Sequence, residues 1–201
     1  VGSEMCIRDR SVRVAIAAWA WPNYMDPDSS ERGIKVRTSS YTRHHVNITM
    51  CKAKAIGNYT NSILALHEAL ESGCDEAMLL DPEGCVAEGS GENIFIIRNG
   101  VLHTPELTSC LDGITRNTVF TLAREAGLEV RERRITRDEV YIADEAFFTG
   151  TAAEVLPIRE VDGRQIGSGL RGPITEQLQT AYFDQVRGRI STHPEWHTAV
   201  G

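Results

Sequence analysis

Two lysines stand two residues apart in the segment MCKAKAIGNY, residues 50–59. A lysine amine becomes a nucleophile when burial or a neighbouring cation lowers its pKa, and it then commonly attacks a carbonyl carbon. The surrounding segment VNITMCKAKA predicts a strand. Because side chains alternate along a strand, Lys52 and Lys54 would share one face. Spacing alone therefore leaves either lysine as a candidate reagent, and leaves open that both are solvated surface charges.

Three later segments suit the binding of an anionic ligand. In EGSGEN, residues 88–93, two glycines let the backbone approach a ligand behind the Glu88 carboxylate. In DGITR, residues 112–116, the free amides and the dipole of a helix start attract phosphate. In TGTAAE, residues 149–154, Thr151 and its small neighbours have the composition of an anion-binding nest. All three lack the Gly-Lys-Ser/Thr ending of a nucleotide-binding loop, which disfavours nucleoside triphosphates.

Composition narrows the class of protein. The chain of 201 residues is 41% hydrophobic with a net charge of −7, which favours small-molecule chemistry over binding to nucleic acid or anionic membranes. Its longest apolar run, residues 14–21, is too short to span a bilayer. Five cysteines without a C-x-x-C pair suit a reducing cytoplasm. His193 and His197 are separated by Pro194, which argues against a helical metal-ligand pair, so we expect no metal.

The elements that must position these residues predict a mixed α/β fold. Helices are expected over 61–72, from DGITR to 126, after Thr136, and over 173–188. Strands are expected over 12–21, 34–43, 46–55, 76–81, 85–89, 93–105, 128–135 and 145–150. Asn99-Gly100 and Asp162-Gly163 are hairpin signals, and Thr136 with Glu139 forms a capping box.

The chain also shows candidate boundaries. Residues 1–10 have neither apolar periodicity nor targeting character, and we interpret them as a foreign or artefactual end. Residues 26–33 collect Asp, Pro, Ser and Gly and predict a linker. One compact domain is expected over 34–201.

Taken in order, several segments resemble the fold type IV, or class IV, aminotransferases that use pyridoxal phosphate. The branched-chain amino acid aminotransferases are the most similar group. The segments are AAWAWPNY, RHHVN, KAKAIGNYTNS, LLDPEGCVAEGSGENIF, GVLHTPELTSCLDGITR, ADEAFFTGTAAEVLPI and GPITEQLQTAYFD. Two details depart from the family pattern: TSCLDGITR is one residue shorter than usual, and Pro22 replaces a more usual glycine.

The resemblance implies a D-amino acid aminotransferase-like fold in which residues 34–201 form the large, C-terminal, pyridoxal-phosphate-binding domain. Residues 11–25 would then be a remnant of the small N-terminal domain, reduced to its last strand. Because that domain contributes to the site in the family, we expect impaired turnover from this chain.

The resemblance also assigns roles to individual residues. Lys54, followed by Ala-x-Gly-Asn-Tyr, matches the lysine that forms the Schiff base with the cofactor, which leaves Lys52 as an ordinary lysine. Glu88 matches the partner of the pyridine nitrogen, and Tyr59 the partner of the phenolic oxygen. The cofactor phosphate would be held by Ile114, Thr115 and Thr151, and the substrate by Ala152, Trp21 and Tyr24. Arg43 and Asn58 are left outside the site.

The implied reaction is amino-group transfer between leucine, isoleucine or valine and 2-oxoglutarate, in a homodimer or larger homo-oligomer. A D-amino acid aminotransferase or an aminodeoxychorismate lyase is the alternative within the same fold. A non-catalytic fragment that binds no cofactor is the alternative from another class.

Overall fold

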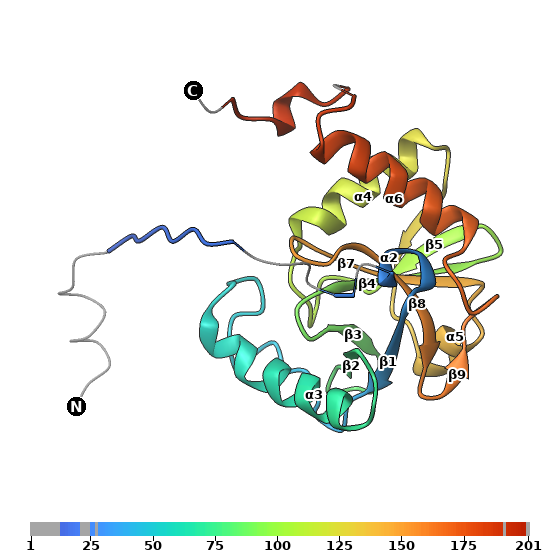
Figure 1. The fold of residues 1–201 in the computed structure, drawn as a ribbon. Helices are drawn as coiled ribbons and strands as arrows, with labels where there is room; N and C mark the ends of the chain where they lie inside the picture. Colours follow the sequence, from blue (N-terminus) through green and yellow to red (C-terminus); the bar gives the residue numbers. More distant parts are fainter. Residues whose placement is uncertain (1–12, 21–24, 27, 191, 200–201) are drawn as a thin grey trace.

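A mixed β-sheet forms the centre of the computed structural model, which describes residues 13–20, 25–26, 28–190 and 192–199 (Figure 1). The strands are β1 Ile34–Thr38, β2 Glu76–Leu80, β3 Val86–Gly89, β4 Asn93–Arg98, β5 Val101–Thr104, β6 Val130–Glu132, β7 Glu145–Gly150, β8 Glu154–Val161 and β9 Arg164–Gln165. The helices are α2 Ser29–Arg32, α3 Tyr59–Glu71, α4 Ile114–Glu125, α5 Arg137–Tyr141 and α6 Pro173–Val186, with 3-10 turns η1 Ile56–Asn58 and η2 Pro194–Trp196.

The sheet confirms the mixed α/β class. Its order is β3-β2-β1-β8-β7-β4-β5-β6, with β9 paired to β8. Strand β1 runs parallel to both β2 and β8, and β5 runs parallel to β6, whereas the other pairs are antiparallel. Both predicted hairpin turns are present, since Asn99-Gly100 and Asp162-Gly163 adopt positive φ at both positions. Such turns match the twist of the strands they join.

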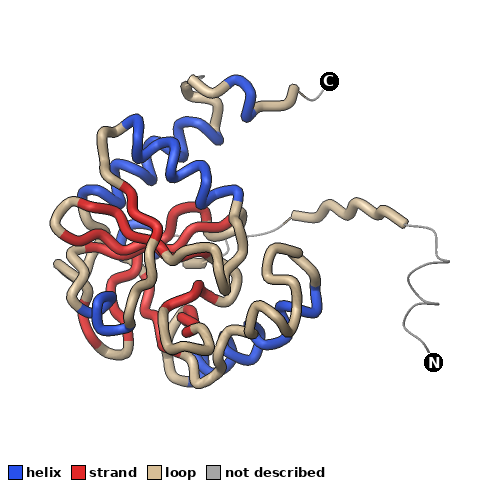
Figure 2. Tube along the Cα trace, turned by 180° about the vertical axis from the view of Figure 1, so that it is seen from behind, coloured by secondary structure: helices blue, strands red, loops and turns tan. Residues whose placement is uncertain are grey.

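Two hydrophobic clusters lie on opposite faces of the sheet. Neighbouring residues of β7 separate them, because Phe147 belongs to the cluster under α4 and α6 while Phe148 belongs to the other. Under the helices, Phe95 stacks on Phe147 with ring centroids 5.0 Å apart and meets the edge of Phe120. Figures 1 and 2 show α4 and α6 side by side over one end of the sheet, with α3 at the other end.

Local signals fix the ends of the helices. Helix α5 begins with the predicted capping box of Thr136 and Glu139. Helix α4 is followed by Gly127 at φ 71°, a conformation that suits glycine. At the start of α6, the buried Glu145 carboxylate accepts hydrogen bonds from the amides of Ile174 and Thr175. A carboxylate at this place also complements the helix dipole.

Two predicted strands are wrong. The segment 46–55 forms turns instead of a strand, and its apolar side chains Val46, Ile48 and Met50 are exposed. Residues 13–20, the described part of the predicted strand 12–21, are extended without strand pairing and are also exposed. A strand needs a neighbour to satisfy its backbone groups and a core to cover one face. Neither segment has these within the described residues, so alternation alone misled the prediction.

The predicted linker 26–33 contains the single helical turn α2, which lies against β8. Gly33 ends it at φ 78°, where an added Cβ would stand 3.2 Å from the Pro157 carbonyl oxygen. Two other strands are shorter than predicted: β1 ends at Thr38 and β6 covers only Val130–Glu132. The described part of the chain contains neither a helix long and apolar enough to cross a membrane nor a cluster of three or more residues suited to a metal ion.

The Phe95 stack yields a stability prediction. Replacing Phe95, which is fully buried, with alanine removes its ring contacts and leaves a cavity under α4. We expect the free energy of unfolding to fall by about 3–5 kcal/mol, measured by urea denaturation. Ile142→Ala, at an exposed position of the segment after α5, serves as the control and should change it by less than about 0.5 kcal/mol. Equal losses in both variants would contradict the packing described above.

Candidate active site

A narrow cavity of about 20 Å³ lies between the loop that carries the two lysines and the turn between β3 and β4. Tyr59, at the start of α3, and Glu88, at the end of β3, both line it. Arg43, Asn93 and Leu111 also line it. Residues from four separate segments of the sequence therefore meet at one place.

Glu88 is the buried carboxylate of this cavity. Its Oε2 accepts a hydrogen bond from the Leu111 amide at 3.1 Å and a longer one from Asn93 Nδ2 at 3.4 Å. Its Oε1 lies 2.7 Å from Arg43 Nη2 but accepts no hydrogen bond, so this contact is ionic without hydrogen-bond alignment. Burial raises the pKa of Glu88 to about 6, although the Arg43 charge and the Leu111 amide act against that rise. One buried oxygen of the Glu88 carboxylate is thus still able to accept a hydrogen bond.

Arg43 is the site residue that the sequence prediction left out. It is only 5% exposed, and Nη1 donates to Ser62 Oγ at 3.1 Å and to the Asn58 carbonyl oxygen at 3.4 Å. These bonds connect it to α3 and to η1, while Nη2 faces Glu88. A buried guanidinium requires a carboxylate partner, but the sequence does not show which of many acidic residues provides it.

The two lysines have different surroundings. Lys52 Nζ donates to the carbonyl oxygens of Leu107 and Cys110, at 2.5 and 2.9 Å, and so anchors the loop before α4. Lys54 Nζ instead donates to the Tyr59 hydroxyl at 2.7 Å and is exposed. Asn58 holds the loop in place, since its Nδ2 donates to the carbonyl oxygens of Met50 and Ala53. The side-chain amine of Lys54 therefore contacts the Tyr59 hydroxyl, whereas that of Lys52 contacts only backbone carbonyl oxygens among the described residues.

Asn93 connects the Glu88 carboxylate to the start of α4. Its Nδ2 also donates to the Leu111 carbonyl oxygen at 2.9 Å. Its Oδ1 would lie 2.1 Å from a Cβ at Gly113, so only glycine fits before this helix. Ile114 and Thr115 follow directly in the first turn of α4, the former exposed and the latter buried. The predicted phosphate-binding helix start is thus held beside the cavity.

Thr151 and Ala152 lie on the exposed turn between β7 and β8. The pairing of Asn93 with Thr149 brings this turn to the start of β4, and a Cβ on Gly150 would stand 3.5 Å from the Gly91 carbonyl oxygen. Both residues nevertheless line a separate cavity of about 660 Å³ beside α2 and α6. The structure thus brings Lys54, Tyr59 and Glu88 together and places the turn next to them. The predicted substrate residues Trp21 and Tyr24 lie outside the described residues.

The buried ion pair gives a test of this arrangement. Replacing Arg43 with methionine leaves the Glu88 carboxylate buried without a cation. We expect the free energy of unfolding to fall by about 3–5 kcal/mol at pH 8, measured by urea denaturation. The folded pKa of Glu88, about 6, already exceeds its ordinary 4.5, so protonation stabilises the fold and this contribution disappears as the pH rises through 6. The loss in the variant should therefore shrink toward pH 4.

Two further variants control this experiment. Arg98→Met breaks a surface ion pair with Asp144 and should cost less than about 1 kcal/mol. Arg43→Met combined with Glu88→Gln should be more stable at pH 8 than Arg43→Met alone, because a neutral amide needs no cation. Wild-type stability of the single variant at pH 8 would show that the pair does not form.

Comparisons with known proteins identify the family of the chain. Residues 6–161 match the family model described as amino-transferase class IV. The chain is 68% identical over 189 residues to the branched-chain-amino-acid aminotransferase of Pseudomonas aeruginosa, covering 94% of this chain and 62% of that relative. It is 44% identical over 187 residues to the enzyme of the same name from Escherichia coli K12, covering 92% and 60%.

Solved structures give the same result. The Escherichia coli branched-chain amino acid aminotransferase superposes with a TM-score of 0.89 at 43% identity, over 92% of this chain and 61% of that chain. The branched-chain amino acid aminotransferase of Thermobaculum terrenum, solved in its PLP-form, superposes with a TM-score of 0.84 at 44% identity, over 88% and 58%.

The chain spans about three fifths of the length of the curated relatives that it matches. The matched residues include Lys54, Tyr59, Glu88 and the start of α4, and the fold that carries them is that of the solved aminotransferases. The chain belongs to the class IV aminotransferase family.

Proposed function

We propose that the protein is a pyridoxal-phosphate-dependent transaminase that transfers the amino group between branched-chain L-amino acids and 2-oxoglutarate. The observation that carries this proposal is the meeting of Tyr59 and the Arg43–Glu88 pair around one cavity, with Lys54 hydrogen-bonded to Tyr59. The branched-chain names of the relatives support leucine, isoleucine and valine over the D-amino acid and aminodeoxychorismate alternatives.

The described residues fit this cofactor in their chemistry. Glu88 Oε1 is buried and accepts no hydrogen bond, so it suits a protonated ring nitrogen. The Tyr59 hydroxyl would face the phenolic oxygen, while Ile114 and Thr115 at the start of α4, with Thr151, would hold the phosphate. When bound, pyridoxal phosphate supplies an aldehyde that condenses with amines and a ring that withdraws electrons from the bond to be broken.

Lys54 would act as both nucleophile and proton carrier. Its Nζ is exposed and, among the described residues, has only the Tyr59 hydroxyl as hydrogen-bond partner, so it has freedom to reorient. In this role Nζ removes the proton from the substrate Cα and later returns one, acting first as base and then as acid. Tyr59 would orient the amine. The Arg43 charge would keep Glu88 ionised opposite a cationic ring nitrogen.

Substrate binding would involve the turn between β7 and β8. The Ala152 amide is proposed to hold the substrate carboxylate, which its exposed position on this turn supports. Trp21 and Tyr24 remain proposed parts of the side-chain pocket on the strength of the resemblance alone.

We also propose that the protein is a cytoplasmic homodimer or larger homo-oligomer. Exposed apolar side chains support a covered face near the lysine loop: Ile48, Met50 and Ile56 belong to the loop and to η1, and Ile63 and Leu64 to α3. The four described cysteines are free thiols, which suits a reducing compartment.

Covalent labelling tests the assignment of the lysine. The purified chain is mixed with pyridoxal phosphate, reduced with borohydride and digested, and the modified peptide is mapped by mass spectrometry. We expect the label on Lys54, because Lys52 is occupied by two carbonyl oxygens. Lys52→Ala is the matched control and should keep the label, whereas Lys54→Ala should lose it. Label on Lys52 would overturn the assignment, and no label would favour a fragment that binds no cofactor.

Substrate profiling tests the reaction. The whole protein with its cofactor should convert L-leucine, L-isoleucine and L-valine with 2-oxoglutarate, measured as glutamate formation. Lys54→Ala should lower turnover by at least about a hundredfold, since it removes the acid and base. Faster turnover of D-alanine than of L-leucine would replace the branched-chain proposal with the D-amino acid alternative.

A further inference from the structure

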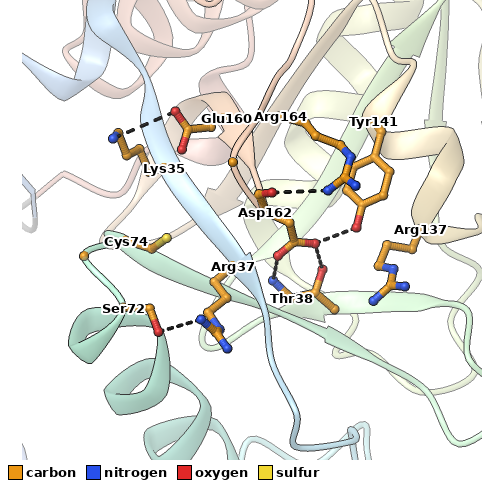
Figure 3. Close-up of a pocket in the computed structure, with 12 residues that line it drawn as sticks. Lys35, Arg37, Thr38, Ser72, Cys74, Arg137, Tyr141, Glu160, Asp162 and Arg164 are labelled. Carbon is orange, nitrogen blue, oxygen red and sulfur yellow. Dashed lines mark hydrogen bonds and ion pairs between the residues drawn. The ribbon is translucent and has the colours of Figure 1, made fainter.

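A third cavity, of about 550 Å³, lies away from the candidate active site (Figure 3). Its walls come from β1, the end of α3, α5 and the β8–β9 hairpin. It shares no lining residue with the cavity around Glu88. The proposed transaminase chemistry therefore does not explain it.

Four cationic side chains surround this cavity. Lys35 and Arg37 project from the same face of β1, Arg137 begins α5, and Arg164 begins β9. Figure 3 shows Arg37 and Arg137 on either side of Thr38. The three guanidinium groups thus reach the cavity from three separate elements.

The three arginines have no carboxylate partner within ion-pair distance among the described residues. Arg37 donates to Ser72 Oγ at 2.7 Å, which is a neutral group. Arg164 lies over the Tyr141 ring at 4.6 Å and donates to the Asp162 carbonyl oxygen. The Arg137 guanidinium makes no hydrogen bond or ion pair to any described residue, although its charge acts on Asp162 at longer range. Most arginines elsewhere in the structure, by contrast, pair with Asp or Glu, as Arg98 does with Asp144.

Two carboxylates also line the cavity, and both are already engaged. Glu160 lies 3.9 Å from Lys35 Nζ. Asp162 accepts hydrogen bonds from the Thr38 amide, the Thr38 hydroxyl and the Tyr141 hydroxyl, at 2.6 to 2.7 Å. Partial burial acts to raise the pKa of Asp162, but these bonds, with a smaller contribution from the Arg137 charge, lower it. Asp162 therefore ties the hairpin to β1 through these bonds and forms no ion pair with the three arginines.

The side chains that line this cavity carry a net positive charge, whereas the whole chain is negatively charged. Four cations face two carboxylates here, although the chain has a net charge of −7. A concave surface with one sign of charge concentrates ligands of the opposite sign. Arginine forks bind carboxylate and phosphate oxygens in pairs, and the volume is that of a metabolite site.

We propose that this cavity binds a small anion that carries at least two phosphate or carboxylate groups, held by Arg37, Arg137 and Arg164. The binding is independent of the transaminase site. Lys35 adds a further positive charge to the lining of the cavity, and the aromatic ring of the half-buried Tyr141 adds an apolar surface.

Isothermal titration calorimetry with two probes tests this site. Pyrophosphate represents the phosphate source and citrate the carboxylate source, each at about 0.15 M ionic strength to screen diffuse attraction. We expect one molecule of at least one probe to bind each chain, and the tighter probe identifies the group that is recognised. Arg37→Ala and Arg137→Ala should each weaken binding at least about tenfold, because each removes charge-assisted hydrogen bonds. No saturable binding of either probe would overturn the proposal.

Two control variants locate the binding. Arg131→Ala removes an exposed arginine of β6 outside the cavity and should leave the affinity unchanged. Thr151→Ala alters the proposed phosphate site of the cofactor and should also leave it unchanged. A loss in Thr151→Ala equal to that in Arg137→Ala would assign the binding to the active site and overturn the proposal. Circular dichroism of every variant confirms that the fold is intact, and equal affinity in Arg37→Ala, Arg137→Ala and Arg131→Ala would count against the cavity.

Discussion

The buried ion pair of Arg43 and Glu88 is the interaction on which the candidate active site depends. Each charge is removed from water, and each would be costly without the other. Arg43 lies in the loop after β1 and Glu88 ends β3, and β2 stands between these strands in the sheet. The pairing of three strands therefore determines whether the two charges meet. The same pair leaves one Glu88 oxygen without a hydrogen bond, which is the chemical feature that a protonated ring nitrogen would use.

From Glu88, a chain of polar contacts fixes the other candidate segments. Asn93 donates both to Glu88 and to the Leu111 carbonyl oxygen, which holds the approach to α4. Gly113 must lack a side chain because Asn93 occupies the space beside it. The pairing of β4 with β7 then brings the β7–β8 turn alongside. Glycines and short polar side chains serve here because backbone segments must approach each other closely.

Charge is distributed differently in the cavity around Glu88 and in the cavity around Asp162. Around Glu88 the cation and the carboxylate are both buried and face each other as an ion pair, so neither side chain is exposed to solvent. Around Asp162 the carboxylate is satisfied by hydroxyl and amide donors, and the neighbouring arginines are left for solvent or for a ligand. The first arrangement suits a constant chemical task. The second suits reversible binding of an anion, as proposed above.

Local signals were sufficient for much of the fold. The hairpin turns at Asn99-Gly100 and Asp162-Gly163, the capping box at Thr136 and the helices ended by glycine depend on neighbouring residues only, so the sequence predicted them correctly. The segment 46–55 was predicted wrongly because alternation of apolar residues does not reveal whether a sheet is present to receive them. In the fold its backbone is held by the Asn58 side chain and by the contacts of Lys52 with the loop before α4.

By itself the sequence determined the mixed α/β class and the family resemblance, and it predicted Lys54 over Lys52 as the Schiff-base lysine, since these rest on the order of short motifs. Only the tertiary structure decided that Arg43 pairs with Glu88 in the candidate site, that Lys52 contacts backbone carbonyl oxygens and that three arginines line one separate cavity. The physical reason is the same in each case. A charge acquires its role from the partners that surround it, and those partners come from distant segments that only the folded sheet brings together.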